Sequence, residues 1–255
     1  MKFKFAVCFF LYGIGAYASN DFLSYCQNEN LSTEEKVTLS FIKIKTRAFG
    51  CGELKAKIPQ ITALDLSNTK DISDLTPLKF FKNIENLNLN KSVYIKDLRP
   101  LSNLTSLKIL ELEDNKIEDL TPLSGLSLLE TLVLDWNKIK DYQPICQLPN
   151  LKVLKINFNQ VRIVDHLRNL PSLEIIFING NQIKDISSMA DLTQLKVAKL
   201  WLNEIQDISP LKNLMLLENI DVEENPIIKN TSNCPTDVNT TKVVRQFCSK
   251  YLSTP

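Results

Sequence analysis

The chain has 255 residues, of which 44% are hydrophobic, so it can bury a substantial core as one large or two small domains. Its 30 basic and 29 acidic residues nearly balance, and this gives no sign of the basic excess that nucleic acids or anionic membranes attract. Only six glycines occur, which disfavours loops that cradle phosphate groups.

The first 18 residues have the layout of a secretory signal peptide. Two lysines precede an apolar run over residues 5–14, and Ala16-Tyr17-Ala18 supplies small residues before Ser19. The run is too short to span a bilayer comfortably, and no later apolar segment approaches membrane length. We therefore expect residues 1–18 to be removed, and the product to be exported to the periplasm or the medium without membrane insertion.

Residues 19–58 have the pattern of a small helical unit. Ser32 and Glu35 stand at the spacing of a capping box, which opens a helix. Gly50 is the expected stop of that helix. Four apolar residues of this helix fall on one stripe and are expected to face inward, namely Val37, Phe41, Ile44 and Ala48.

A repeat of 22 residues fills residues 59–228. Its frame is Leu-x-x-Leu-x-Leu-x-x-Asn-x-Ile, as in the copy from Leu107 to Ile117. Two looser upstream copies have 23 residues and carry Thr69 and Ser92 in place of the asparagine, which brings the array to eight units. The asparagines of the frame are Asn115, Asn137, Asn159, Asn181, Asn203 and Asn225.

Each part of this frame has a physical role. The alternating leucines predict a short strand with leucines inward and the residues between them outward. The asparagine amide can satisfy backbone groups of its own coil and of the neighbouring coil. Asp and Pro in the return path, as at Asp119 and Pro122, favour 3₁₀ turns because the path is too short for a full helix. One copy has Ile163 and His166 in those places, so we expect its turn to be distorted.

Stacked coils of this kind predict an α/β fold, a curved leucine-rich-repeat solenoid with a concave parallel sheet, convex 3₁₀ or irregular turns, and helical caps at both ends. The frame, with phrases such as Asp119-Leu120-Thr121-Pro122-Leu123 and Leu104-Thr105-Ser106-Leu107, resembles the 22-residue repeats of bacterial internalin-type proteins. The resemblance covers about residues 59–228 and implies this fold in an exported protein. It says little about the ligand, because the frame is the buried part of each coil.

Residues 229–255 are expected to cap the other end, because a solenoid exposes its apolar core at both ends. We expect a helix that starts at Thr236 or Asp237. Its inward stripe would be Val244, Phe247, Cys248 and Tyr251.

Five cysteines follow residue 18, and an oxidising compartment favours their pairing. Two lie near the start and two near the end, which predicts the local bridges Cys26–Cys51 and Cys234–Cys248. The alternative is four unpaired buried thiols. Cys146 is left over and is interpreted as a small buried hydrophobic residue.

Catalytic constellations are scarce. The one histidine, His166, falls on a convex turn, where a surface role is commoner than membership of a catalytic triad. No Cys-x-x-Cys, Walker-type or Gly-x-Gly-x-x-Gly sequence occurs, and one histidine cannot form a multi-histidine metal site. We therefore expect no enzymatic activity, no cofactor and no metal.

The outward strand positions carry the informative variation, because the frame does not dictate them. Both tryptophans, Trp136 and Trp201, fall there, with Phe158 between them. Exposed aromatic clusters rimmed by charge mark interaction sites, although these rings could instead pack on one another to cover the strands. The predicted partner-binding residues are Glu111, Glu113, Asp135, Trp136, Lys155, Phe158, Phe177, Lys199, Trp201 and Leu202.

These features predict a monomeric, non-catalytic module that binds a protein partner, such as a host or envelope protein, and no nucleic acid. A glycan is the second candidate, because aromatic platforms beside Asp, Asn and Glu also suit sugar rings. A purely structural envelope role is the third. The same repeat class includes a eukaryotic regulatory subunit of protein phosphatase 1, but a signal peptide and disulfides conflict with such a role.

Overall fold

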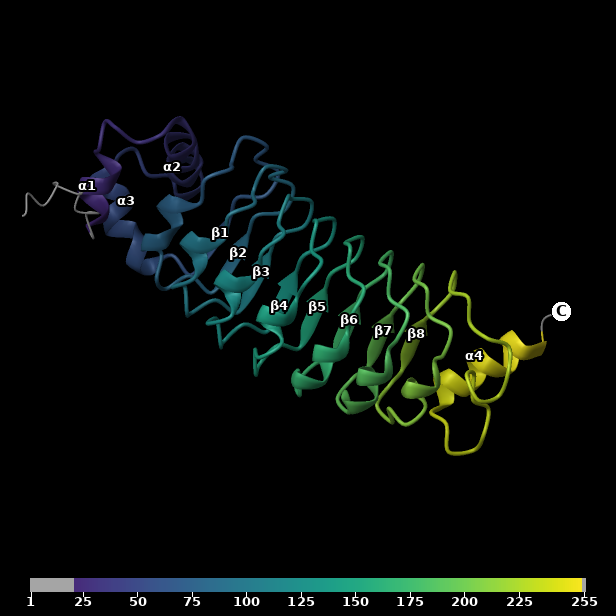
Figure 1. Ribbon diagram of the computed structural model, residues 1–255. Coiled ribbons are helices and arrows are strands. Elements are labelled where there is room, and N and C mark those ends of the chain that lie inside the picture. The colour runs from purple at the N-terminus through teal and green to yellow at the C-terminus, as the bar shows by residue number, and fades with distance from the viewer. Residues whose placement is uncertain (1–20, 254–255) are drawn as a thin grey trace, which may run out of the picture.

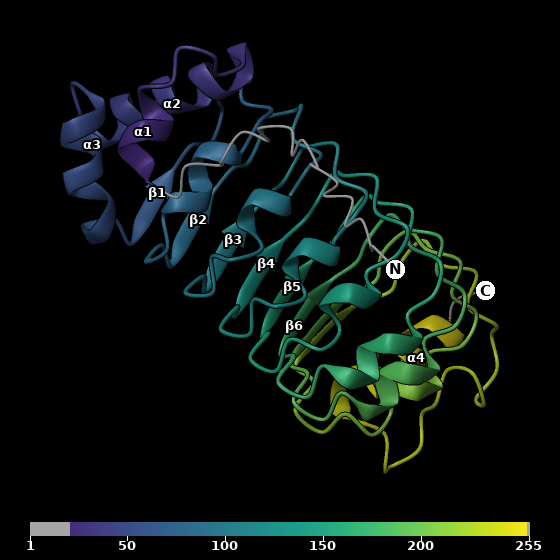
Figure 2. The same ribbon diagram turned by 60° about the vertical axis from the view of Figure 1, so that its left-hand side comes forward.

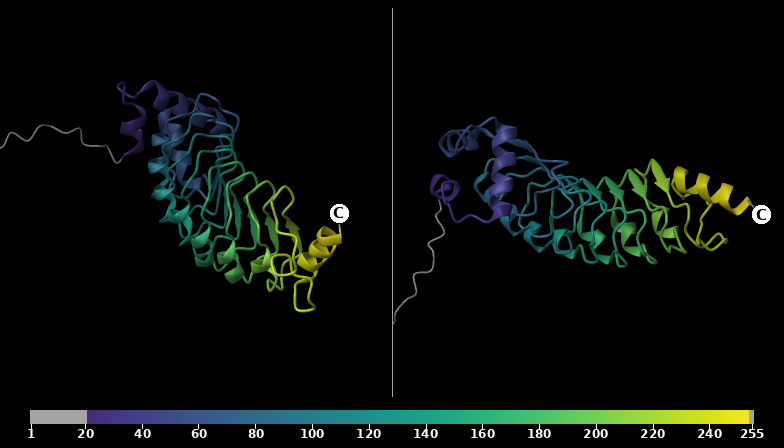
Figure 3. Two further views of the ribbon diagram at one scale, coloured as in Figure 1. Left: turned by 45° about the vertical axis from the view of Figure 1, so that its right-hand side comes forward. Right: turned by 90° about the horizontal axis from the view of Figure 1, so that it is seen from above.

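The computed structural model describes residues 21–253. Eight short strands form one parallel sheet in which each strand pairs with its neighbours in the sequence. The coils stack into a long curved array, with the sheet on the inner face and 3₁₀ turns on the outer face (Figures 1 and 3). The strands are β1 (Ala63–Asp65), β2 (Asn86–Asn88), β3 (Ile109–Glu111), β4 (Thr131–Val133), β5 (Val153–Lys155), β6 (Ile175–Phe177), β7 (Val197–Lys199) and β8 (Asn219–Asp221).

The strands pair in register, so that equivalent residues of successive coils lie side by side. Leu110 is aligned with Leu132, and Leu132 with Leu154. These leucines are fully buried, and the aliphatic residues of the return paths meet them in one continuous core. One coil cannot bury its own leucines, so stacking is the main stabilising interaction of the fold. This confirms the curved solenoid with a concave parallel sheet.

The frame asparagines form the predicted ladder of hydrogen bonds. The Asn137 amide nitrogen donates to the carbonyls of Leu112 in the preceding coil (2.9 Å) and Leu134 in its own coil (3.1 Å). The Asn137 amide oxygen accepts from the backbone N–H of Ile117, also in the preceding coil (2.9 Å). Each asparagine therefore satisfies buried backbone groups that no strand partner reaches. The same pattern recurs at Asn159, Asn181, Asn203 and Asn225.

The ladder changes where the two longer coils precede it. Asn115 still donates to the Leu89 and Leu112 carbonyls. Its amide oxygen, however, is buried and has no hydrogen-bond partner within residues 21–253. The preceding coil carries Ser92 and one extra residue, and none of its described N–H groups donates to this oxygen as Ile117 does to Asn137.

The outer face carries 3₁₀ turns that begin after an aspartate. In the third coil, the Asp119 carboxylate accepts the backbone N–H of Thr121 (2.8 Å), which caps the turn Thr121–Leu123. Equivalent bonds are made by Asp74, Asp97, Asp141, Asp185 and Asp207. The coil with Ile163 lacks this cap, yet it keeps a 3₁₀ turn over Asp165–Asn169. The expected distortion is therefore limited to the lost side-chain bond, with Ile163 left exposed.

Three helices precede the sheet, α1 (Phe22–Cys26), α2 (Thr33–Thr46) and α3 (Cys51–Lys57). The capping box is confirmed, since the Ser32 side chain accepts from the Glu35 N–H and the Glu35 carboxylate accepts from the Ser32 N–H. Helices α1 and α3 are absent from the sequence-based prediction. Gly50 is the N-cap of α3 and does not end α2, which stops at Thr46 and is followed by Arg47 in the left-handed region.

The predicted inward stripe is only partly right: Ala48 is buried and Phe41 packs against the core, but Ile44 is 68% exposed. The buried residues of α2 itself are Thr38, Leu39 and Ile42. The polar Thr38 faces inward because its hydroxyl donates to the Asp74 carbonyl (2.7 Å). A tertiary hydrogen bond thus shifts the buried face away from the purely apolar stripe.

Helix α4 (Lys242–Ser253) covers the last strand. It begins later than predicted, because Asp237 closes a turn by accepting from the Asn239 N–H and the Thr240 hydroxyl. The predicted stripe does face the core: its Val244 and Cys248 are buried, and the rest of the stripe is partly buried against them. No helix among residues 21–253 is long and apolar enough to cross a membrane.

Both predicted disulfides are present. Cys26–Cys51 joins α1 to α3, with Cα atoms 5.8 Å apart, and Cys234–Cys248 ties the last loop to α4, with Cα atoms 5.3 Å apart. Cys146 is buried and unpaired. The predicted signal peptide lies outside the described residues, and the boundaries 19–58, 59–228 and 229–255 stay predictions.

Candidate binding face

Three aromatic residues meet on the concave face, over strands β4 to β7. The rings of Trp136 and Phe158 stack, with centroids 4.1 Å apart and planes 16° apart. The rings of Phe158 and Trp201 meet edge to face, with centroids 6.2 Å apart and planes at 69°. We call Trp136, Phe158 and Trp201 the aromatic cluster. Trp136 is 54% exposed, and the other two are half-buried, so the cluster lies on the surface of the protein.

Trp136 and Phe158 occupy a backbone position that large side chains rarely adopt. In all eight coils the residue just before the frame asparagine, or before its equivalent Thr69 or Ser92, has a positive φ, between 51° and 62°. Such a conformation costs about 1–2 kcal/mol for an L-residue other than glycine, asparagine or aspartate. The turn itself therefore gives no reason to place rings here. The eight residues are Asn68, Lys91, Asp114, Trp136, Phe158, Gly180, Leu202 and Glu224.

Gly180 makes the room for Phe158. A Cβ atom on Gly180 would lie 2.4 Å from Cδ1 and 2.6 Å from Cε1 of the Phe158 ring. The other coils hold seven different side-chain-bearing residues at this position, so φ alone does not require glycine. The glycine is needed because the ring lies directly against its backbone. Sequence analysis did not find this contact, and the break in the aromatic column at Gly180 was its one visible signal.

A second ladder of side chains runs through the concave face beside the cluster. The Asp135 carboxylate accepts the backbone N–H of Asn157 (2.6 Å), the Asn157 amide oxygen accepts that of Asn179 (2.8 Å), and the Asn179 amide oxygen accepts that of Trp201 (2.8 Å). This ladder fixes the backbone on which Trp201 stands. It also escaped the sequence analysis, although Asp or Asn at the same place in three successive coils was a signal for it.

The Asp135 carboxylate lies beside the cluster in a largely buried environment. Burial raises its pKa above the usual value of 3.8, and the nearby negative charge of Glu113 acts in the same direction. The hydrogen bond from Asn157 and the charge of Lys155 oppose these effects without cancelling them. Asn157 and Asn179 do the same structural work without a charge. The ladder therefore does not need a negative charge at position 135.

The remaining predicted site residues surround the cluster in pairs. Glu111 accepts from the Asn90 amide (2.9 Å) at the β3 side. The Lys155 ammonium lies 5.2 Å from the ring centroid of Phe177, to which it is aligned across β5 and β6. Lys199 donates to the Asn219 amide oxygen (2.7 Å). Leu202 is 42% exposed and is separated from Phe158 by the Gly180 coil.

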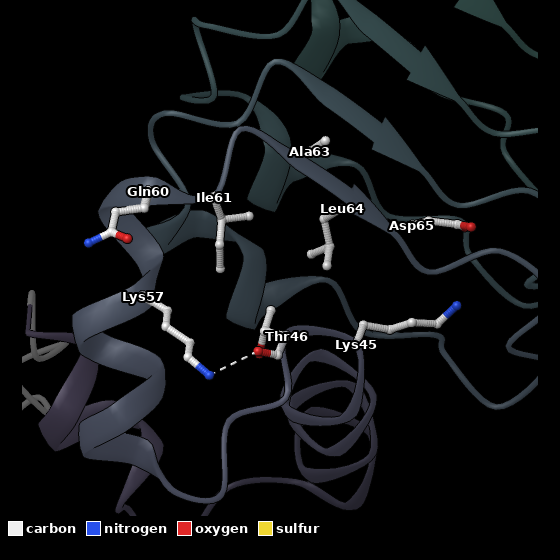
Figure 4. A pocket seen from close by; sticks show the side chains of 8 residues that line it. All are labelled: Lys45, Thr46, Lys57, Gln60, Ile61, Ala63, Leu64 and Asp65. Atoms are coloured by element: carbon white, nitrogen blue, oxygen red, sulfur yellow. Dashed lines mark hydrogen bonds between the residues drawn. The ribbon is translucent and has the colours of Figure 1, made fainter.

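A separate hollow of about 470 Å³ lies between the N-terminal helices and β1. Figure 4 shows that Lys57 reaches toward Thr46, whose carbonyl its ammonium contacts at 3.1 Å, and that Lys45 extends along the Asp65 side of the hollow. Hydrogen bonds from Ser67, and to a smaller extent the charge of Lys45, hold the pKa of Asp65 below its usual range. None of the predicted site residues lines this hollow.

The structure also places the lone histidine. His166 and the exposed Ile163 line an outer-face hollow of about 490 Å³, together with Arg162 and Gln182. This hollow contains no cysteine or serine that could act with the histidine. Within the described part of the chain, no group of three or more His, Cys, Asp or Glu side chains is arranged to hold a metal ion.

Eight parallel strands, 3₁₀ turns on the opposite face and an asparagine ladder define a leucine-rich-repeat solenoid. A family model described as leucine-rich repeats (2 copies) matches residues 149–192. No match was found among curated proteins.

Solved structures extend the match to most of the chain. Internalin C2 from Listeria monocytogenes is 32% identical, with 73% of this chain and 92% of that protein covered and a TM-score of 0.63. Internalin F from the same organism is 22% identical over 77% of each chain, with a TM-score of 0.59. A leucine-rich-repeat protein from Leptospira interrogans is 20% identical over 67% of this chain and 56% of its own, with a TM-score of 0.52, and shares the fold. This chain belongs to the internalin-type family of leucine-rich-repeat proteins.

Proposed function

We propose that this chain is an exported, non-catalytic module that binds a protein partner through the aromatic cluster. The solenoid is a fold suited to binding, since stacked coils create an extended concave surface. The observation that carries the proposal is the stacked pair of Trp136 and Phe158, held at the surface in a backbone conformation that disfavours large side chains. Because the turn is common to all eight coils and does not favour large rings, the choice of two aromatic residues here supports a role outside the fold.

The surroundings of the cluster are those of an interface. Aromatic side chains dominate binding energy where they sit at the centre of a patch, with polar groups at its rim. Here the rim combines acidic and basic groups, which favours a partner that carries basic groups and some acidic ones. The rim consists of Glu111, Glu113, Asp135, Lys155, Phe177, Lys199 and Leu202.

Asp135 adds an independent argument. Its burial disfavours the charged form, whereas a neutral asparagine serves the same ladder in the next two coils. A carboxylate kept where the fold works with an amide points to a role outside the fold. A basic group of the partner, placed next to Asp135, would relieve the burial penalty on binding.

The two disulfides support export, because such bonds persist in oxidising compartments. We propose that residues 1–18 direct the chain to the periplasm or the medium, and that it works as a monomer.

The test uses the chain from Ser19 onward as bait for extracellular and periplasmic proteins, followed by titration calorimetry with the captured partner. Trp136→Ala and Trp201→Ala are expected to reduce affinity at least tenfold, the scale of an interface hot spot. Met215→Ala is the control, because Met215 is an exposed apolar residue outside the concave face. Unchanged far-UV spectra would show that the variants fold. Undiminished affinity in both tryptophan variants would reject this site.

A glycan partner is the second candidate. The amide oxygens of Asn157 and Asn179 are used by the ladder, while their amide nitrogens donate no hydrogen bond within residues 21–253. Free amide donors beside aromatic rings suit sugar hydroxyls and ring faces. Binding on a glycan array that depends on Trp136, in the absence of any captured protein, would favour this candidate over a protein partner.

A further inference from the structure

The loop between α2 and α3 exposes the least covered large apolar side chain among residues 21–253. Phe49 is 98% exposed, and Ile44, in the last turn of α2, is 68% exposed. The helices α2 and α3 that flank this loop lie at the N-terminal end of the array, beyond β1 (Figure 2). We call Lys43, Ile44, Lys45, Arg47 and Phe49 the cap tip. These two apolar side chains contribute little to the core of the fold.

The cap tip is held in place, so its exposure is not the result of a loose loop. Arg47 adopts the left-handed conformation that ends α2, and the Ala48 N–H donates to the Lys43 carbonyl (2.9 Å). The Phe49 N–H donates to the Glu53 carboxylate (2.9 Å). Lys57 donates to the last carbonyls of α2, and the disulfide at Cys51 anchors the start of α3. A preorganised group loses little freedom when it binds.

The cap tip is also a local concentration of positive charge. Residues 43–57 contain five basic residues and one acidic residue, although the whole chain is nearly neutral. Lys55 and Lys57 form ion pairs with Asp21 and Glu53. No ion pair in the described part of the chain includes the three other basic residues, Lys43, Lys45 and Arg47. Lys43, Lys45 and Arg47 can therefore interact with an external anionic group, and within residues 21–253 only Lys45 of these also acts on an acidic side chain, that of Asp65.

We propose that the cap tip binds reversibly to an anionic lipid surface. Phe49 and Ile44 would enter the boundary between headgroups and acyl chains, and Lys43, Lys45 and Arg47 would face the lipid phosphates. A lipid surface suits this feature better than a protein pocket, because the apolar groups protrude from the molecule and do not line a hollow. Docking by one end leaves the concave face free for its own partner.

The experiment measures co-sedimentation of the chain from Ser19 to Pro255 with sucrose-loaded vesicles. This form contains every described residue and lacks the apolar run of residues 5–14, which would itself bind lipid. Phosphatidylcholine vesicles are compared with vesicles that also contain phosphatidylglycerol. We expect on the order of tenfold stronger partitioning into the anionic vesicles, and a loss of that preference as salt is added.

Two variants and two matched controls identify the surface. Phe49→Ser and the double variant Lys43→Glu/Lys45→Glu are expected to abolish anionic-vesicle binding. Met215→Ser removes another exposed apolar side chain, and Lys138→Glu/Lys140→Glu reverses two exposed lysines of the fourth coil, so both are expected to bind like the unaltered chain.

Several outcomes would overturn the proposal. These are no binding to anionic vesicles, equal binding to both vesicle types, or binding that survives Phe49→Ser. Self-association that depends on Phe49, seen by light scattering without vesicle binding, would assign the cap tip to a second copy of the chain. None of these outcomes affects the role of the concave aromatic cluster, because Trp136 and Trp201 are unaltered in every variant.

Discussion

The ring of Phe158 lies against the backbone of Gly180, in the space that any side chain at position 180 would fill. The same ring also stacks on Trp136 of the preceding coil. The glycine therefore sets the position of both rings. Equivalent positions in other coils accept Leu202 and Asp114 with the same backbone conformation. Gly180 is thus a positioning residue for the aromatic cluster.

Replacing Gly180 with alanine is therefore expected to displace the ring of Phe158. The added Cβ would meet the ring at 2.4 Å, and an alanine at φ +62° adds a backbone cost of about 1–2 kcal/mol. Near-UV circular dichroism should report the altered packing of Trp136, and urea unfolding the lower free energy of unfolding. Gly125→Ala is the matched control, because a Cβ there meets nothing within 4 Å. Equal near-UV spectra for Gly180→Ala and the unaltered chain would contradict the positioning role.

The sequence predicts the repeat geometry well, because each coil repeats the same local physics. Leucine alternation, the asparagine amide and the aspartate before each turn act within a coil or between identical neighbours, as at Asn137 and Asp119. The short helices α1 and α3 leave no such periodic signal, since the Cys26–Cys51 bridge and packing on the first coils stabilise them. The buried face of α2 depends on the bond from Thr38 to a distant carbonyl, which periodicity cannot reveal.

The candidate site was only partly predictable for a similar reason. Alternation along a strand places Trp136 and Trp201 outward, and the parallel register brings them near Phe158. The dependence of Phe158 on Gly180, and the bond between Asp135 and the next coil, arise from contacts between different residues of adjacent coils. Such contacts occur only between these coils, and the repeat frame shared by all coils does not reveal them.

Asp135→Asn is expected to stabilise the protein at neutral pH. Burial raises the pKa of Asp135 in the folded chain above 3.8, so the folded state binds its proton more tightly than the unfolded state does. This contribution to stability is fully present below pH 3.8 and is lost as the pH rises through the folded-state pKa. Asparagine keeps an acceptor for the Asn157 N–H and removes the titration. Thermal melts from about pH 3, where carboxylates titrate, to about pH 8 would measure the difference in stability between the two proteins.

Asp185→Asn provides the opposite case. The hydrogen bond from the Ser187 backbone holds the pKa of Asp185 below 3.8, so its contribution is present above that pH and is lost as the pH falls through the folded-state pKa. This variant should not gain stability at neutral pH. If Asp135→Asn and Asp185→Asn shifted the melting temperature in the same direction at neutral pH, the assignment of Asp135 as a buried, penalised charge would be wrong.

The Cys146 thiol is expected to be unreactive in the folded protein. Its side chain is 1% exposed, and burial raises its pKa to about 12, so almost no thiolate is present at neutral pH. Ellman's reagent, applied to the chain from Ser19 onward, should detect no thiol before denaturation and one thiol in guanidinium without reductant. Detection of several thiols in guanidinium would mean that the disulfides do not form, and rapid labelling of the native protein would mean that Cys146 is accessible.

Removing the C-terminal disulfide should destabilise the end of the array. Cys234 and Cys248 are 14 residues apart, and closing a loop of this size contributes about 3 kcal/mol in the chain-entropy model. Because coils of a solenoid are stabilised by their neighbours, Cys234→Ser/Cys248→Ser should loosen α4 and the last coil before the centre unfolds. Hydrogen exchange would show faster exchange in α4 and β8 than in β4. A variant that lacks all four paired cysteines is the control for reductant, since its melting temperature should not respond to dithiothreitol. An equal melting temperature of the unaltered chain with and without dithiothreitol would contradict a stabilising role for both bridges.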